Sequence, residues 1–550
     1  MKISVITPVY QPPASVLREC IESVLAQTHD EWEFCIVDDG SPADYVIPIL
    51  NEYANADDRI RLALRSINGG IVAASNEALT MATGEFVALL DHDDMLHRHA
   101  LERIVTAVAA APDVDYVYTD EDHLDSAGCH FGAFYKPDWS PERFRSQMYT
   151  CHLSTLRRNL VEEVGGFHEG YDGSQDYDLV LRVTERARKV IHIPEVLYHW
   201  RSSEQSTSSN PDAKPWAYEA GVRAVQAHCD RVGIRATVSP THIPGCHRVR
   251  RTLVDPPRVS VIIATAGTTQ EVHGLRRTFA VEAVRDLIER TDYPNLEVIV
   301  VADRSTPRAV TADLENIAGD RLKLVWFEGP FNSAEKVNVG SCHASGDLLL
   351  LLDENIETIS PDWLHVMVSL TQDDDVGVVG ARLLFADGTL QHAGHVYAGN
   401  PLYAFFGRDP GESGPSGLLQ VDRETSGVAA ACALVKTSVF RAVGGMTTHL
   451  AGNLEDVDFC LKVRHLGHRI LWTPYATLFH FDSQNLTSPM LADDVEFLHN
   501  RWAEELGHDP YHNPNLMPGR DDWLPRRIDD SAPRHRVTPS VPPLNHSCDR

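Results

Sequence analysis

The sequence predicts an α/β protein of two tandem domains, each with a mainly parallel sheet flanked by helices, followed by a disordered C-terminal tail. Three observations support this prediction. Short apolar runs alternate with helical patterns, a set of motifs occurs twice in the same order, and the last residues are rich in Pro and Arg. The chain has 550 residues, 43% of them hydrophobic and 23% charged, which is ample material for large cores.

The first domain begins with the alternation that is typical of a parallel sheet. Ile3–Val9 and Phe34–Val37 are predicted strands, and Val16–Ala26 between them has its apolar residues at helical spacing. Phe86–Leu90 is a further predicted strand. Ligands of such sheets bind beyond the carboxyl ends of the strands, so the residues that follow each strand are the candidates for chemistry.

The second domain repeats the landmarks of the first. The strand Ser4–Thr7 returns as Ser260–Ile263, and a Gly-Gly turn, an acidic cluster and an aromatic-flanked histidine follow in both copies. These later landmarks are Gly165–Phe167, Gln175–Asp178 and Tyr198–Trp200 in the first copy, and Gly444–Met446, Glu455–Asp458 and Phe479–Phe481 in the second. Pro256 and Pro257 break the chain before the second copy. The predicted domains are therefore 1–250 and 258–515, with a disordered tail over 519–550.

Charge and composition exclude several classes of protein. The net charge of −29 argues against sequence-independent nucleic-acid binding, which depends on Lys and Arg neutralising phosphates. No apolar run approaches the 18 or so residues of a membrane span, and the first residues read as a strand rather than a signal peptide. The ten cysteines form no C-x-x-C pair, which indicates neither a zinc site nor a disulfide framework and favours a cytoplasmic location.

Acidic residues follow two of the predicted strands. Asp38–Ser41 comes after Phe34–Val37, and Asp91–Asp94 (D-H-D-D) comes after Phe86–Leu90. Carboxylates packed at the end of a buried strand repel one another unless a cation compensates, and oxygen ligands suit Mg²⁺ or Mn²⁺. A solvated acidic turn is the alternative. No P-loop or G-x-G-x-x-G motif is present, which favours phosphate held by a metal over a glycine cradle.

A second acidic site precedes a helical pattern. Asp176 and Asp178 stand before Leu179–Val190, where Asp could simply cap a helix or could supply a general base. His199 follows as a candidate metal ligand. A lone histidine in an aromatic setting is more often a satisfied core residue, but His480 recurs at the matching place after the second acidic cluster, which favours the ligand.

The ordered motifs T-P-V-Y, I-V-D-D-G-S, L-L-D-H-D-D, G-G-F, Q-D-Y-D and Y-H-W-R resemble those of family 2 glycosyltransferases of the GT-A fold. The second copy resembles the same family through Phe331-Asn332, Gly377–Gly380, Gln391–Gly394, Glu455–Cys460 and Thr473–Ala476. Together the copies resemble tandem enzymes that build O-antigen and related bacterial surface polysaccharides. The resemblance implies an inverting, metal-dependent enzyme that moves a sugar from a nucleotide-sugar donor to a glycan or lipid-linked glycan acceptor.

The resemblance also implies a role for individual residues. The general bases are Asp176 and Asp456. The residues expected to bind the nucleotide sugar are Pro8, Tyr10, Asp39, Asp91, Asp303 and Asp353. The residues expected to hold Mn²⁺ or Mg²⁺ are Asp93, His199, Asn355 and His480. A lipid-linked acceptor would place the enzyme at the inner face of a membrane, where a partner would have to bring it.

The second copy departs from the family pattern at the end of its Leu348–Leu352 strand. There Asp353-Glu354-Asn355 offers an amide as the last ligand, which should weaken metal affinity. The copy is therefore either a second transferase or a degenerate domain that binds glycan or braces the first domain. Two alternatives for the whole chain are a nucleotidyltransferase and a non-catalytic sugar-binding scaffold. Tyr10–Ala14 lacks the glycine and the cation expected of the first, and the second leaves the paired carboxylates unexplained.

Overall fold

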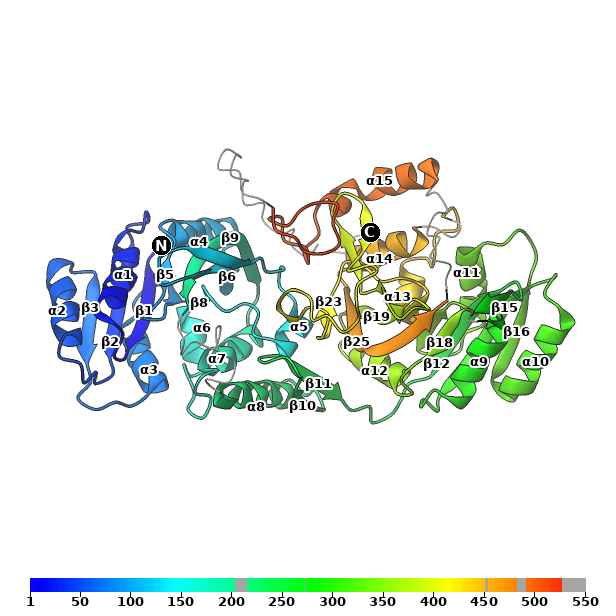
Figure 1. Ribbon diagram of the computed structural model, residues 1–550, viewed down its shortest axis with the longest axis horizontal. Coiled ribbons are helices and arrows are strands. Elements are labelled where there is room, and N and C mark those ends of the chain that lie inside the picture. Colours follow the sequence, from blue (N-terminus) through cyan, green and yellow to red (C-terminus); the bar gives the residue numbers. More distant parts are fainter. Residues whose placement is uncertain (203–214, 273, 451–453, 482–490, 527–550) are drawn as a thin grey trace, which may run out of the picture. The chain divides into compact units, whose positions relative to one another are not determined.

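The computed structural model describes residues 1–202, 215–272, 274–450, 454–481 and 491–526. The chain divides into two compact units. Each contains a large, mainly parallel sheet flanked by helices, which confirms the predicted α/β class (Figure 1). Within the described ranges, no helix is long and apolar enough to span a membrane.

The first unit comprises residues 1–139, 147–249 and 525–526 of the described chain. Its strands are β1 (Ile3–Val9), β2 (Trp32–Asp38), β3 (Ile60–Leu64), β4 (Phe86–Leu89), β5 (Met95–Leu96), β6 (Tyr116–Leu124), β7 (His130–Phe134), β8 (Thr155–Arg157), β9 (Val190–Arg201), β10 (Ala236–Pro240) and β11 (His247–Arg251), the last running into the second unit. Its helices are α1 (Ala14–Leu25), α2 (Val46–Ala56), α3 (Ile71–Met81), α4 (Ala100–Ala110), α6 (Arg158–Glu163), α7 (Gln175–Thr184) and α8 (Pro215–Arg231).

The second unit comprises residues 140–146 and 250–524 of the described chain. Its strands are β12 (Val259–Thr265), β13 (Thr269–Val272), β14 (Leu275–Thr278), β15 (Leu296–Asp303), β16 (Leu322–Phe327), β17 (Leu348–Leu352), β18 (Ile356–Thr358), β19 (Val376–Leu384), β20 (Leu390–His392), β21 (His395–Tyr397), β22 (Pro401–Tyr403), β23 (Arg423–Glu424), β24 (Cys432–Lys436) and β25 (Arg469–His480). Its helices are α5 (Pro141–Ser146), α9 (Phe279–Glu289), α10 (Arg308–Ala318), α11 (Ser333–His343), α12 (Trp363–Leu370), α13 (Thr437–Ala442), α14 (Glu455–His465) and α15 (Ala492–Gly507).

The two sheets have the same topology. The main path is β3-β2-β1-β4-β8-β6-β9-β5 in the first unit and β16-β15-β12-β17-β24-β19-β25-β18 in the second. In both, three parallel pairs join the first four strands of the path. All five leucines of β17 are buried in the middle of the sheet, where β17 pairs parallel with β12 and antiparallel with β24. The repeat seen in the sequence is therefore a repeat of folded structure.

The Gly-Gly turn of each repeat packs against an asparagine. Gly166 has φ +69° and Gly445 has φ +74°, and a Cβ atom there would lie 2.6 Å from Asn76 Oδ1 and 2.4 Å from Asn338 Oδ1, respectively. Asn76 Oδ1 accepts the backbone N–H of Phe167, and Asn338 Oδ1 accepts that of Met446. Only glycine provides both the backbone angle and the space, which explains why this turn recurs.

A buried glutamate on the second strand of each repeat is held by a serine on the first. Ser4 Oγ donates to Glu33 Oε1 at 2.6 Å, and Ser260 Oγ donates to Glu297 Oε1 at 2.6 Å. Burial alone would raise the pKa of each carboxyl. The hydrogen bonds that each glutamate accepts, including one from a lysine ammonium, outweigh burial and lower both pKa values to about 2.

The lowered pKa values of Glu33 and Glu297 predict that acid destabilises the fold. A carboxyl whose pKa is lower in the folded state stabilises the fold above its ordinary pKa of 4.5, and this contribution is lost as the pH falls toward about 2. We expect the free energy of unfolding, measured by urea titration, to decrease across that interval. The variants Glu33→Gln and Glu297→Gln should be less stable than the parent at pH 7 and should lose less on acidification. An unchanged pH slope in both variants would contradict the assignment.

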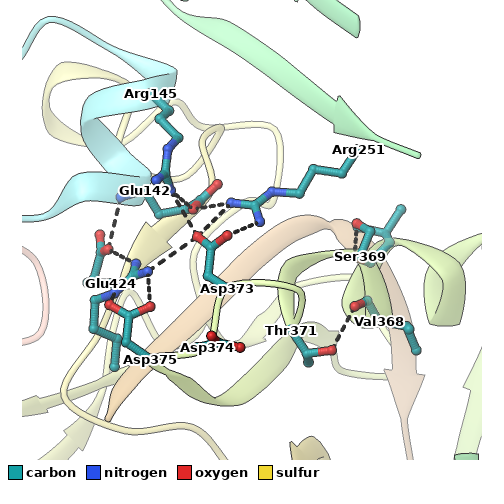
Figure 2. A network of polar contacts seen from close by, with 12 residues as sticks. Glu142, Arg145, Arg251, Val368, Ser369, Thr371, Asp373, Asp374, Asp375 and Glu424 are labelled. Carbon is teal, nitrogen blue, oxygen red and sulfur yellow. Dashed lines mark hydrogen bonds and ion pairs between the residues drawn. The ribbon is translucent and has the colours of Figure 1, made fainter. Parts of the chain in front are cut away.

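Residues 140–146 belong to the second unit although they lie within the sequence of the first repeat. Glu142 on α5 forms an ion pair with Arg251, whose Nη2 lies 2.7 Å from Glu142 Oε2. Nη1 of the same guanidinium lies 2.8 Å from Asp373 Oδ1 (Figure 2). Glu424 accepts the backbone N–H of Glu142 at 2.9 Å and pairs with Arg469 at 2.7 Å. The side chains of Glu142, Arg251 and Glu424 are 1%, 0% and 0% exposed. The predicted boundary near residue 250 would leave residues 140–146 in the first domain, whereas the structure assigns them to the second unit.

The packed part of the second unit extends past the predicted start of the tail at residue 519. The Trp523 ring stacks on Phe405 with centroids 4.7 Å apart, and Asp521 accepts the backbone N–H of Phe406 at 2.9 Å. The remainder of the predicted tail, 527–550, lies outside the described residues.

Candidate active site

A cavity opens in the first unit at the carboxyl ends of β1 and β4, where the sequence predicts ligand binding. Its lining includes Pro8 of β1, Asp91 after β4, His152 before β8, Asp176 of α7 and Tyr198 of β9. The structure thus brings three of the predicted site residues, Pro8, Asp91 and Asp176, to one place. They come from separate segments whose ends meet at one edge of the sheet.

The acidic turn Asp91–Asp94 divides into two kinds of carboxylate. Asp94 is buried, and its oxygens accept the Tyr198 hydroxyl at 2.6 Å and the backbone N–H of Arg201 at 2.8 Å. Burial, together with the charges of Asp93 and Asp91, raises the pKa of Asp94 well above its usual range. Asp94 therefore fastens the turn to β9, whereas Asp91 is exposed at the cavity.

Helix α7 presents two aspartates with different surroundings. Asp176 lines the cavity, and its Oδ1 accepts the backbone N–H of Tyr177 at 2.8 Å. Burial raises the pKa of Asp176, which suits a proton acceptor at neutral pH. Asp178 points into the protein, where it is fully buried and pairs with Arg182 at 2.6 Å. The sequence could not separate the two, because both lie in the first turn of one helix.

His152 is a site residue that sequence reasoning missed. Its ring stacks on Tyr198 with centroids 4.6 Å apart, and Nδ1 lies 3.3 Å from Glu121 Oε2. The buried Lys136 ammonium donates to the same Glu121 oxygen at 2.9 Å and to the His152 carbonyl at 2.6 Å. His152 follows no acidic strand-end motif, so no local pattern of the sequence could have indicated it.

His199, a predicted metal ligand, contacts Asp122 of β6. Its Nδ1 lies 2.6 Å from Asp122 Oδ1, and His130 Nδ1 lies 3.0 Å from the other oxygen of Asp122. Asp122, His130 and His199 offer their ligand atoms within 4.8 Å of one another, as do Asp91, Asp94 and His152. Asp93 belongs to neither group, and its role as a metal ligand stays a prediction.

The predicted nucleotide-binding residues Tyr10 and Asp39 lie at the ends of β1 and β2. Tyr10 is 46% exposed. Asp39 is buried and accepts backbone N–H groups from Gly69 and Gly70 at 2.9 and 2.8 Å, and it pairs with Arg65 at 2.9 Å. Asp39 therefore also shapes the loop before α3, and base recognition by Tyr10 and Asp39 stays a prediction.

The corresponding end of β17 in the second unit brings two predicted residues together. His480 Nε2 lies 3.5 Å from Asp353 Oδ2, and His480 Nδ1 lies 2.8 Å from Gln391 Oε1. Asn355 adjoins them through its backbone carbonyl, which accepts the N–H of Phe481 at 2.9 Å. Metal binding by Asn355 and His480 stays a prediction.

Asp303 in the second unit pairs with a lysine, whereas Asp39 in the first unit pairs with Arg65. The fully buried Lys336 ammonium pairs with Asp303 Oδ1 at 2.6 Å and donates to the Thr265 carbonyl at 2.9 Å. Arg304, the residue after Asp303, pairs with Glu328 at 2.7 Å. The cation that pairs with the acid therefore comes from α11 in the second unit, whereas in the first unit it is Arg65, which follows β3.

The donor atoms of the first unit fit a divalent cation. Asp91, Asp93 and Asp94 lie on a single turn, and burial, followed by the charges of Asp93 and Asp91, raises the pKa of Asp94. The Asp91 carboxylate and the His152 imidazole offer ligand atoms within 4.8 Å of each other and of Asp94, whose oxygens accept hydrogen bonds from Tyr198 and Arg201. Carboxylate and imidazole together suit Mn²⁺, and carboxylate with phosphate suits Mg²⁺.

Comparison with known proteins identifies the family. The family model described as glycosyl transferase family 2 matches residues 4–165 and 268–444. An uncharacterized protein of Sinorhizobium fredii is 37% identical over 545 residues, covering 95% of this chain and 58% of its own length. The O-antigen biosynthesis protein RfbC of Myxococcus xanthus is 36% identical over 539 residues, covering 96% of this chain and 41% of its own length. The chain thus spans about half the length of these relatives.

Among solved structures, residues 1–349 of TarS from S. aureus match 42% of this chain and 65% of that one, with 21% sequence identity and a TM-score of 0.34. A likeness of this size supports no conclusion about function.

Proposed function

The chain belongs to glycosyltransferase family 2, and from that premise we propose that it transfers a sugar from a nucleotide-sugar donor to a growing bacterial surface glycan with inversion of the anomeric centre. The observation that carries the proposal is the cavity shared by Asp91 and Asp176, an exposed acid at a strand end and a half-buried acid at a helix start. Membership of this family sets the nucleotidyltransferase and the non-catalytic scaffold aside.

In the proposed reaction Asp176 removes the proton from an acceptor hydroxyl. The acceptor oxygen forms a bond to the anomeric carbon while the bond from that carbon to the diphosphate oxygen breaks, and the nucleoside diphosphate leaves. The raised pKa of Asp176 favours taking the proton. Asp91 and His152 would hold Mn²⁺ or Mg²⁺, which supplies positive charge to the leaving diphosphate. Pro8, Tyr10 and Asp39 would hold the nucleoside, and a surface glycan as acceptor is supported by the likeness to the O-antigen biosynthesis protein.

Donor hydrolysis tests this function. We expect one of a panel of UDP-, GDP- and dTDP-sugars to release its nucleoside diphosphate when Mn²⁺ or Mg²⁺ is present, and we expect EDTA to abolish that release. The measurement is chromatographic detection of the free diphosphate from the full chain. No metal-dependent release from any donor would overturn the proposal.

A further inference from the structure

The second unit carries an imidazole beside its predicted base, but on a different element from the first. Arg157 and Lys436 both pair with the first residue of the neighbouring strand, β4 or β17, so the chain position of His152 corresponds to Ala431. The second unit therefore lacks an equivalent of His152. Its buried imidazole comes instead from His395, the first residue of β21.

His395 is aimed at Asp456. Its Nε2 lies 3.6 Å from Asp456 Oδ2, and no hydrogen-bond partner for Nε2 is present among the described residues. The His395 side chain is 1% exposed and that of Asp456 is 14% exposed. A buried ring nitrogen without a partner is costly, so its orientation toward a carboxylate near the surface calls for a functional reason.

The surroundings of His395 hold its ring in place. Its Nδ1 lies 3.3 Å from the Tyr397 hydroxyl, and its ring stacks on Tyr403 with centroids 5.2 Å apart and an interplanar angle of 7°. A Cβ atom at Gly427 would lie 2.6 Å from Nδ1, so position 427 must be glycine for the ring to fit. When Tyr397 donates to Nδ1, the ring proton is on Nε2 and faces Asp456.

The charged groups around His395 are consistent with a neutral ring. Burial lowers the pKa of His395, and the charges of Asp456 and Asp509 oppose this effect. His392, whose ring centroid is 5.3 Å away, also has a pKa lowered by burial. A neutral imidazole with a proton on Nε2 is a hydrogen-bond donor that does not itself compete for the proton of the acceptor.

We propose that His395 is a positioning residue of a second transferase site, in which its Nε2–H orients the Asp456 carboxylate as the base. The Val457 N–H already donates to Asp456 Oδ1 at 2.8 Å, as the Tyr177 N–H does to Asp176. His395 would then fix the other oxygen, which keeps a second lone pair for an acceptor hydroxyl. This inference rests on the proposed function, and it makes the second unit an active enzyme rather than a degenerate domain.

The test compares two substitutions in the full chain carrying Asp176→Asn, which silences the first site. His395→Phe keeps the ring volume and the stack on Tyr403 but removes the donor, whereas His395→Gln keeps an N–H near the place of Nε2. With the UDP-, GDP- and dTDP-sugar panel and Mn²⁺, we expect His395→Phe to lower kcat by about 10–100-fold with KM for the donor unchanged, and His395→Gln to recover part of that loss. His499→Phe, on α15, is the matched histidine control and should change neither constant.

Three results separate the inference from the function on which it rests. If Asp456→Asn abolishes transfer but His395→Phe does not lower kcat, the positioning role of His395 is overturned, while Asp456 remains the proposed base of the second site. If the Asp176→Asn chain is inert with every donor, or if Asp456→Asn leaves its activity intact, the second site itself is overturned. Folding of each variant is checked by NMR of the ¹⁵N-labelled histidines, whose other signals should stay unchanged. The one signal that disappears in His395→Phe is assigned to His395. That signal should titrate at lower pH in Asp456→Asn, and an unchanged midpoint would overturn the contact.

Discussion

Replacing Asp176 by Asn should remove transfer by the first unit while leaving donor affinity and folding intact. An amide cannot accept the proton of the acceptor hydroxyl, and general-base catalysis contributes about 10²–10⁴-fold to rate. We expect kcat to fall by that factor, with the KM for the donor nearly unchanged, because Asp91 and the nucleoside-binding residues are untouched. The measurement is sugar transfer by a chain that also carries Asp456→Asn, so that only the first site contributes.

Asp178→Asn is the matched control, since it removes the same charge two residues along the same helix. Asp178 pairs with Arg182 in the interior, so its loss should lower the thermal unfolding midpoint rather than act selectively on kcat. If transfer survives Asp176→Asn but is lost with Asp456→Asn alone, the second site rather than the first is the main centre. If Asp176→Asn has full activity in the Asp456→Asn chain, Asp176 is not the base.

Replacing Arg251 by Ala should destabilise the second unit by about 3–5 kcal/mol, the cost of breaking a buried ion pair from one side. The substitution removes one of the two cations that Glu142 and Asp373 share and leaves Arg145 as the other (Figure 2). In the intact protein burial alone would raise the pKa of Glu142, but the charges of Arg251 and Arg145 outweigh burial and lower it. Loss of the Arg251 guanidinium therefore disfavours the ionised form of Glu142. Urea unfolding should show an earlier transition for the second unit.

The adjacent Arg250 offers a control of the same residue type. Its side chain is 65% exposed and pairs with the 36%-exposed Asp362 at 3.2 Å, so Arg250→Ala should cost less than about 1 kcal/mol. The same reasoning predicts that a fragment starting at residue 250 lacks α5 and is less stable than the second unit in the full chain. Equal unfolding midpoints for Arg250→Ala and Arg251→Ala would contradict the role of the buried network.

Much of the fold was predictable because it is encoded in local patterns. A buried parallel strand must be a continuous apolar run, as Leu348–Leu352 is, and a helix on a sheet must repeat its apolar residues at i, i+3 and i+4, as Leu17, Cys20, Ile21 and Val24 do in α1. The repeat was legible for the same reason. Because carboxyl ends of parallel strands meet at one edge, Pro8 and Asp91 could also be placed at one site.

The sequence by itself therefore determined the family, the two-fold repeat and the strand-end position of the candidate acids. Only the tertiary structure distinguished the surroundings of these acids. It placed Asp176 at the cavity and Asp178 in the interior, His152 at the same cavity and His395 beside Asp456, and α5 in the second unit. The physical reason is that strand and helix patterns depend on neighbours along the chain, whereas ion pairs, ring orientation and solvent exposure depend on residues that only folding brings together.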